Sequence, residues 1–248
     1  YVNVKASTAM EPIVAKSRAV ILAGGTMSPI SDTIDGLFPA VPVHHHSFAH
    51  LLGADRFAVS LVGRGPAGCK IDCRLENRGD QTMWADVGAV LVNFARITPG
   101  CMCVFFASFP LLQQALVLMS EQVNTLRSIR PLFIEERERG AAGVEQMLQE
   151  YTCTPKACMF AVIGGRLSEG VNLRDDLCRT MIVIGLPYLN DKDVEVAERI
   201  RFGGGGSRFI HNQCMRKVNQ TIGRALRHAQ DYAYILLLDV RYEQVYKD

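Results

Sequence analysis

Residues 101–107 read CMCVFFA, an apolar run of strand length that lacks the alternation of a half-buried strand. Continuous apolar strands are typical of a parallel sheet that is covered by helices on both faces. A helical pattern over residues 111–129 follows directly, and its apolar residues recur at intervals of three and four: Leu112, Ala115, Leu116, Met119 and Val123. A strand followed by a helix is the repeating unit of an α/β fold, so this stretch predicts the fold class.

The same alternation continues on both sides of this stretch. Further apolar runs of strand length occupy residues 18–23, 56–62, 160–163, 180–186 and 234–240. Further helical patterns occupy residues 84–97, 144–151, 193–201 and 211–227. The sequence therefore predicts an α/β fold with a mainly parallel sheet and right-handed crossovers, without an internal repeat.

Residues 203–207 differ in composition from the rest of the chain. They read GGGGS, which is typical of a flexible, unstructured linker. An engineered replacement of a disordered loop and a natural glycine-rich loop both produce such a run, and we favour the former. We expect this segment to carry no function.

The overall composition excludes general disorder, because 48% of the 248 residues are hydrophobic and can form a sizeable core. With 27 basic and 25 acidic residues the net charge is only +2, so a site for a polyanion must come from local geometry. No apolar run approaches the roughly 20 residues that span a bilayer, so we expect no membrane contact. The chain starts at Tyr1 without a signal pattern, and we expect it to be a fragment.

Eight cysteines and a histidine-rich loop raise the question of metal binding. The cysteines lie at irregular intervals, without a pair of CxxC motifs, so we expect free and mostly buried thiols and no iron or zinc in this segment. The histidines are His44, His45, His46 and His50, and they follow a proline-flanked stretch with no matching thiol or carboxylate spacing. We interpret them as an ordinary loop.

Polar clusters follow several apolar runs, where ligands bind in sheets of this kind. The loop GGTMSP places the hydroxyls of Thr26 and Ser28 beside glycines, although a tight turn has the same composition. Ser108 follows residues 101–107 and fits the N-cap of the next helix as well as a ligand contact. The turn GGRLSEGVNL over residues 164–173 contains Glu169, whose burial would require a defined partner.

The run QTIGRALRH over residues 220–228 has the most specific pattern. Gln220, Arg224 and Arg227 are spaced at i, i+4 and i+7, so a helix would place them on one face, and Gly223 would let a neighbour approach the backbone. Arginine is always charged and binds phosphate oxygens with two parallel hydrogen bonds. A phosphoryl site and a solvated basic face both fit this spacing.

These runs occur in an order that resembles motifs III, IV, V and VI of the superfamily 2 DNA helicases of the iron–sulfur, XPD-like group. The matching runs are GGTMSP, VFFASF, GGRLSEGVNL and QTIGRALRH, and the runs CMRKVNQ and LLLDVRY resemble the ChlR-type chromosome-loss helicases in particular. The resemblance covers nearly all of residues 1–248. It implies a RecA-like three-layer sandwich, namely the second, C-terminal domain of an ATP-dependent helicase that moves 5′ to 3′ on DNA.

The resemblance also implies which parts lie elsewhere. The chain has no GxxxxGK[ST] phosphate loop, acidic box or four-cysteine cluster. ATP with Mg²⁺ would therefore be shared with a first RecA-like domain, and the iron–sulfur cluster would belong to the full-length protein outside this fragment. We expect the fragment alone to be inactive.

By the same resemblance, Arg224 and Arg227 would be arginine fingers, and Gln220 would orient phosphates or water. Glu169, Gly170 and Gly223 would form the remaining nucleotide-side positions. The hydroxyls and cations that would contact DNA are Thr26, Ser28, Ser108, Ser168, Arg64, Arg78 and Arg166. The implied partners are single-stranded and forked DNA, the first RecA-like domain, and replication and cohesion factors. The implied setting is the nucleus, in DNA replication, DNA repair and sister chromatid cohesion.

Two other classes of function compete with this interpretation. A non-catalytic RecA-like interaction module would not need both Arg224 and Arg227. A small-molecule enzyme on a Rossmann-like sheet would have a G-x-G-x-x-G turn after an early strand, and Gly24 and Gly25 lack that spacing.

Overall fold

The computed structural model describes residues 5–49, 53, 55–138, 140–167, 172–190, 192–203 and 206–245. The chain divides into two compact units. One unit combines Tyr1–Ala49 with Tyr188–Gln220, and the other combines His50–Pro187 with Thr221–Asp248. No helix in the described ranges has both the length and the apolar content to cross a membrane.

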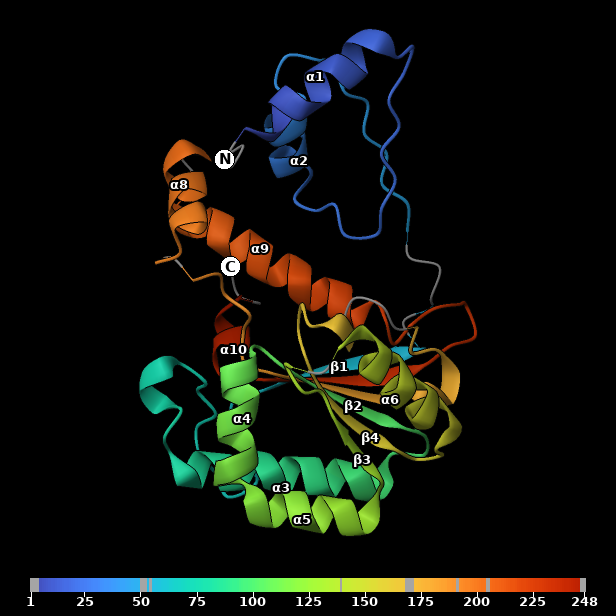
Figure 1. Cartoon of the computed structure of the whole chain (residues 1–248), viewed down its shortest axis with the longest axis vertical. Helices are drawn as coiled ribbons and strands as arrows, with labels where there is room; N and C mark the ends of the chain where they lie inside the picture. Colours follow the sequence, from blue (N-terminus) through green and yellow to red (C-terminus); the bar gives the residue numbers. More distant parts are fainter. Residues whose placement is uncertain are drawn as a thin grey trace. The chain divides into compact units, whose positions relative to one another are not determined.

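The second unit is built on a parallel sheet, which confirms the predicted α/β class (Figure 1). Its described strands run in the order β1-β6-β5-β2-β4-β3, and every neighbouring pair is parallel. Their bounds are β1 (Phe57–Val62), β2 (Met102–Phe106), β3 (Leu132–Ile134), β4 (Cys158–Val162), β5 (Thr180–Ile184) and β6 (Ala233–Leu238). Three of the four interior strands, β2, β4 and β5, are buried along their whole length, which explains why their sequences are continuously apolar.

Helices cover both faces of this sheet. On one face lie α3 (Gln81–Ile97), α4 (Phe109–Leu118) and α5 (Ser120–Ile129), which share a buried apolar core with the strands (Figure 1). On the other face, α6 (Ala141–Cys153) packs through Tyr151, whose hydroxyl lies 3.2 Å from the Cys103 sulfur of β2. The short helices η1 (Leu75–Asn77), η2 (Asp175–Leu177) and α10 (Arg241–Val245) also belong to this unit, which is a three-layer sandwich.

The first unit contains four described helices and no described strand. The helices are α1 (Ala6–Lys16), α2 (Ile30–Leu37), α8 (Val194–Gly203) and α9 (Gly206–Ile222), of which α9 extends two residues into the second unit. The predicted strand over residues 18–23 is wrong, because these residues have no regular structure and the side chain of Ile21 is 88% exposed. An apolar run becomes a strand only when a neighbouring strand pairs with its backbone.

Three further expectations differ from the structure. The single helix expected over residues 111–129 is two helices, which are separated at Met119. The short edge strand β3 was not expected, since three residues are too few to show a pattern. Within residues 203–207, Gly203 ends α8 and Gly206 and Ser207 begin α9, so these described residues lie in helices and not in an unstructured linker.

Candidate functional site

Three of the predicted DNA-contacting residues follow the carboxyl ends of parallel strands. Arg64 follows β1, Ser108 follows β2 and Arg166 follows β4. Because β2 and β4 are neighbours, Ser108 and Arg166 extend from adjacent strand ends, whereas β6 and β5 separate β1 from β2. The carboxyl edge of the sheet therefore carries hydroxyl and cationic groups, and this is the edge where ligands bind in sheets of this kind. Thr26 and Ser28, which were expected after a strand over residues 18–23, do not follow one.

Ser108 is the N-cap of α4, in agreement with the simpler of its two interpretations. Its Oγ accepts a hydrogen bond of 3.4 Å from the backbone N–H of Leu111. The side chain is half-buried, and the hydroxyl proton is not used by this bond. Capping and donation to a ligand oxygen are thus compatible at this residue.

Two of the candidate arginines already bind backbone carbonyls. The exposed Arg64 donates from Nη1 to the carbonyl of Gly68 at 3.1 Å. The half-buried Arg78 donates from Nε to the carbonyl of Cys73 at 3.0 Å. A guanidinium has five N–H donors, so these bonds orient the side chains and leave donors for a phosphate.

The two serine and threonine hydroxyls of the GGTMSP loop lie in the first unit. Thr26 is half-buried and Ser28 is exposed. Arg216 of α9 holds this loop by its backbone, because Nε donates to the Ser28 carbonyl and Nη2 to the Pro29 carbonyl, each at 3.2 Å. Arg216 also approaches the carboxylate of Asp32 at 3.7 Å.

A buried glutamate that the sequence did not reveal shapes the turn after β4. Glu135 is 2% exposed, and its two carboxylate oxygens accept from the backbone N–H groups of Val162 at 2.8 Å and Leu167 at 3.2 Å. A Cβ atom at Gly165 would lie 2.6 Å from this carboxylate, so only glycine fits there. The sequence signal was missing because Glu135 follows a strand of three residues.

The predicted carboxylate in the same turn was Glu169. Ser168, Glu169 and Gly170 lie outside the described residues, so their predicted roles keep the status of predictions.

The predicted helix over residues 211–227 ends earlier than expected. Helix α9 ends at Ile222, so Gln220, Arg224 and Arg227 do not share a helical face, and this part of the prediction is wrong. Around Ile222 the backbone forms turns whose hydrogen bonds join residues three apart. The N–H of Arg224 donates to the carbonyl of Thr221 at 3.1 Å, and the N–H of Ala225 donates to the carbonyl of Ile222 at 3.0 Å. Gly223 favours this ending, because glycine is a poor helix former.

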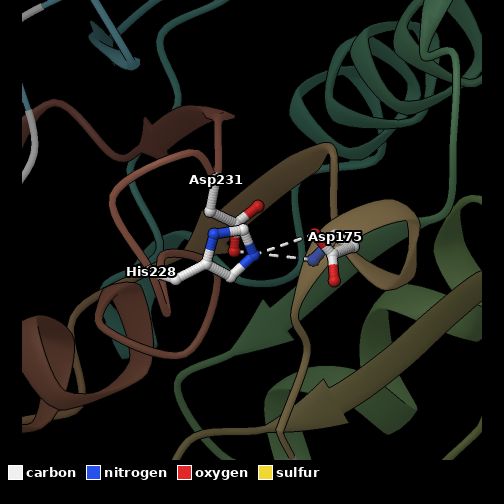
Figure 2. Close-up of side chains that lie close together, drawn as sticks. All are labelled: Asp175, His228 and Asp231. Atoms are coloured by element: carbon white, nitrogen blue, oxygen red, sulfur yellow. Dashed lines mark hydrogen bonds and ion pairs between the residues drawn. The ribbon is translucent and has the colours of Figure 1, made fainter.

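Beyond the helix, the chain is held at a cluster that precedes β5 and β6 (Figure 2). Asp231 is fully buried, and its Oδ2 accepts from the backbone N–H of Arg227 at 3.2 Å and from that of Asp175 at 3.5 Å. Its Oδ1 accepts from Nη1 of Arg179 at 2.8 Å. The side chain of Arg227 itself is exposed. Arg227 therefore lies at the amino ends of these strands, opposite to the edge that carries Ser108.

Two further contacts close this cluster. The ring Nε2 of His228 lies 2.9 Å from Oδ1 of Asp175. Figure 2 marks this contact by a dashed line. Arg179 donates from Nε to Asp176 at 2.9 Å. Burial on its own would lower the pKa of Arg179, but the hydrogen bonds with Asp176 and Asp231 raise that pKa above its ordinary value. Arg179 therefore stays charged.

Asp175, His228 and Asp231 bring three potential metal ligands within 4.8 Å of one another. The arrangement fits a cation that is already present, the guanidinium of Arg179, which lies 2.8 Å from Asp231 and 4.0 Å from Asp175. Both oxygens of Asp231 accept hydrogen bonds from N–H donors, which a metal ion would have to displace. The geometry therefore favours an ion-pair cluster over a metal site.

A family model for the helicase C-terminal domain matches residues 91–248, which include Ser108, Arg166, Arg224 and Arg227. The chain belongs to the helicase C-terminal domain family. The predicted similarity to XPD-like helicases is thereby confirmed, and the runs VFFASF, GGRLSEGVNL and QTIGRALRH fall within the matched residues.

Curated relatives extend this similarity over nearly the whole chain. The ATP-dependent DNA helicase chl1 of Schizosaccharomyces pombe is 38% identical over 98% of this chain and 31% of its own length. The ATP-dependent DNA helicase DDX11 of Danio rerio is 31% identical over 98% of this chain and 30% of its own length. The chain thus spans less than a third of the length of these relatives.

Solved structures support the fold of this helicase C-terminal domain. An XPD helicase structure aligns with a TM-score of 0.60 at 18% identity, over 77% of this chain and 32% of that chain. The structure of S. tokodaii Xpd4 aligns with a TM-score of 0.54 at 21% identity, over 78% of this chain and 36% of that chain. These likenesses confirm the RecA-like α/β fold.

Among the described residues of this helicase C-terminal domain, no group of side chains that could hold a metal ion contains a cysteine. Cys101, Cys103 and Cys178 lie near Tyr151 in the interior, Cys158 is also buried, and all four are free thiols. Burial raises the pKa of Cys101 and of Cys158, which favours the neutral thiol. These side chains pack in the interior and form weak hydrogen bonds, such as that between Cys103 and the Leu177 carbonyl at 3.5 Å.

Proposed function

We propose that this chain is the second motor domain of an ATP-dependent DNA helicase that moves 5′ to 3′. In this proposal, Arg224 and Arg227 are arginine fingers that reach ATP bound on a first RecA-like domain. The observation that carries the proposal is the exposure and the backbone bonding of Arg227, which lies within the residues that the family model matches. Its side chain is exposed, while its backbone N–H is bonded to the buried carboxylate of Asp231.

An exposed cation on a fixed backbone suits phosphoryl transfer. The guanidinium would stabilise the negative charge on the oxygens of the transferred phosphoryl group, an effect of about 10³–10⁵ in rate where an arginine finger has been isolated. Arg224 is half-buried and three residues from Arg227. Gln220 would orient phosphates or the attacking water, and Gly223, Glu169 and Gly170 would complete the nucleotide side. Mg²⁺ would be held by ATP and by groups outside this chain.

A second set of residues would follow the DNA backbone. Hydroxyls and arginines bind phosphates without reading sequence, and the proposed set is Thr26, Ser28, Ser108, Ser168, Arg64, Arg78 and Arg166. Support comes from Ser108 and Arg166, which follow the adjacent strands β2 and β4. Replacing one of these arginines by alanine should reduce the slope of log K against log salt by about 0.7 on single strands, because one phosphate is then no longer neutralised.

The relatives named as ATP-dependent DNA helicases support a wider setting for the same proposal. The longer protein would act in the nucleus on single-stranded and forked DNA, in replication, repair and sister chromatid cohesion, together with replication and cohesion factors. Its iron–sulfur cluster would be held by cysteines outside this chain, a proposal supported by the lack of a cysteine in the potential metal-binding group of the described residues.

Substitution of the two arginines tests the proposal in a helicase that carries both RecA-like domains. We expect Arg224→Ala and Arg227→Ala each to lower kcat for DNA-stimulated ATP hydrolysis by about 10³-fold or more. The melting temperature and the Kd for single-stranded DNA should change little. Arg127→Ala is the matched control, because Arg127 is an exposed arginine on α5 of the same unit.

Other outcomes point to other functions. Normal kcat in both variants would support the non-catalytic interaction module. A weaker Kd with a smaller salt slope would place these arginines on the DNA track.

A further inference from the structure

We propose that Asp231 is a positioning residue for Arg227: its buried carboxylate fixes the backbone from which the Arg227 side chain extends toward ATP. This inference rests on the proposed arginine-finger role of Arg227 and adds a residue that the sequence pattern did not single out. Asp231 is fully buried and lies four residues after Arg227, outside the QTIGRALRH run.

The carboxylate of Asp231 joins segments that are distant in the sequence. Oδ2 accepts from the backbone N–H groups of Arg227 and Asp175, at 3.2 and 3.5 Å. Oδ1 accepts from the N–H of Tyr232 at 3.0 Å and from Nη1 of Arg179 at 2.8 Å. Every one of these partners is a donor, so an ionised carboxylate satisfies all of them and a neutral side chain cannot.

Arg179 connects this carboxylate to the sheet. Its guanidinium lies 4.0 Å from the centre of the Tyr232 ring and donates to the Tyr232 carbonyl at 2.9 Å. Its own backbone is bonded on both sides, to the carbonyl of Cys101 through its N–H and to the N–H of Tyr234 through its carbonyl, each at 2.9 Å. The side chain is 8% exposed. The position of Asp231 is therefore set by the rigid interior.

A second contact holds the residue after Arg227. Nδ1 of His228 accepts from the N–H of Gln230 at 3.3 Å, so Nε2 carries the proton that is donated to Asp175 at 2.9 Å. Asp175 has φ 56°, a backbone conformation that residues other than glycine rarely adopt. The N–H of Asp175 donates to the Asp231 carboxylate, and the carboxylate of Asp175 contacts the His228 ring. Asp175 thus holds the loop that contains His228 and Asp231 at two points. The His228 contact is half-exposed and contributes less than the buried one.

Fixing the backbone of Arg227 matters because catalysis by a charged donor depends on its placement. A displacement of about 1 Å in a group that positions the reacting atoms costs about 10²-fold in rate. Loss of the Asp231 carboxylate should therefore appear in kcat, with little change in KM for ATP or in DNA affinity, because the Arg227 side chain itself is still present.

The substitution Asp231→Asn preserves shape and removes one acceptor. The new NH₂ group would turn away from the positive charge of Arg179 and face the N–H groups of Arg227 and Asp175. The result is a contact between donors, which releases these two backbone segments. We expect kcat to fall by about 10- to 100-fold in the helicase that carries both RecA-like domains.

Asp239→Asn is the matched control. Asp239 is also fully buried, accepts from the N–H of Cys73 at 3.1 Å, and pairs with Arg241 through bonds of 2.8 and 2.7 Å. It lies just after β6, at the end of that strand opposite to Asp231. The two substitutions remove the same kind of carboxylate, but only one of them releases Arg227.

The deciding experiment combines each substitution with Arg227→Ala. Single turnovers with protein in excess over ATP keep slow rates measurable. If Asp231 acts through Arg227, Asp231→Asn lowers the rate in the parent protein and causes no further loss in the Arg227→Ala background. The loss caused by Asp239→Asn should be the same factor in both backgrounds. Melting temperature, KM for ATP and Kd for single-stranded DNA are measured in parallel.

The outcomes separate this inference from the proposed function. If Arg227→Ala collapses the rate but Asp231→Asn leaves it normal, or adds its full loss to that of Arg227→Ala, Asp231 is not a positioning residue. If Arg227→Ala leaves the rate normal, the arginine-finger proposal fails and the inference fails with it. If Asp231→Asn does not fold, Arg179→Lys is used instead, because it weakens the contact between Arg179 and the Asp231 carboxylate. Arg179→Lys must then lower the rate in the parent protein and cause no further loss in the Arg227→Ala background.

Discussion

Arg130 offers a direct test of what holds the sheet of the second unit together. It is 4% exposed and has backbone carbonyls as its hydrogen-bond partners. Its guanidinium donates to Ala95 and Gly100 at 2.5 Å, to Lys156 at 3.0 Å and to Thr98. These carbonyls belong to the end of α3, to the turn before β2 and to the turn before β4. Arg130→Met removes all four bonds while keeping a long apolar side chain.

The expected loss of stability follows from these four bonds. Hydrogen bonds to a charged group contribute about 1.5–3 kcal/mol each, so four would give about 6–12 kcal/mol. Removing the buried guanidinium also removes its desolvation cost of several kcal/mol, which leaves a net loss of about 3–5 kcal/mol. Burial lowers the pKa of Arg130, which shows the same cost. At about 2–4 °C per kcal/mol, the melting temperature should fall by about 6–20 °C.

Urea unfolding followed by tryptophan fluorescence measures this loss in the relevant unit. Trp84 is the single tryptophan of the chain and is fully buried on α3. Arg127→Met is the control, since Arg127 is exposed three residues earlier and should change the free energy of unfolding by less than about 0.5 kcal/mol. If the free energies of unfolding of Arg130→Met and Arg127→Met agree within about 1 kcal/mol, the hydrogen bonds from Arg130 to the four backbone carbonyls do not stabilise the fold as argued.

Three further predictions concern thiols, pH and the chain by itself. Alkylation followed by mass spectrometry should label the exposed Cys153 first and the half-buried Cys69 more slowly, while the six buried thiols are protected, and rapid labelling of a buried thiol would contradict this packing. Burial on its own would raise the pKa of Asp72, but Arg74 and Lys70 lower that pKa below 3.8. The ionised Asp72 carboxylate therefore stabilises the fold above pH 3.8, and this stabilisation is lost as the pH falls below 3.8. The acid-induced loss of stability should be smaller in Asp72→Asn than in the parent chain. The purified chain alone should show no ATP turnover and only weak, salt-sensitive binding to single-stranded DNA, and robust turnover would overturn the two-domain proposal.

The residue pattern was sufficient for the fold class because parallel strands that are buried on both faces must be apolar throughout. Five of the six predicted strands form, and they include the fully buried β2, β4 and β5. Residues 18–23 are also largely apolar, yet they do not form a strand here. Local sequence specifies that a run is fit for pairing, but the presence of a partner is a property of the assembled structure.

The contacts that organise the candidate site were decided only by the tertiary structure. The sequence indicated Arg224 and Arg227 through their spacing, but the helix ends at Ile222 and the loop beyond it is held by Asp231. Asp231 bonds to Asp175, which is 56 residues away, and Glu135 bonds to Val162, which is 27 residues away. Periodicity describes which residues share a face of one element. A buried carboxylate selects its donors only after separate elements have packed around it, and no local pattern contains that information.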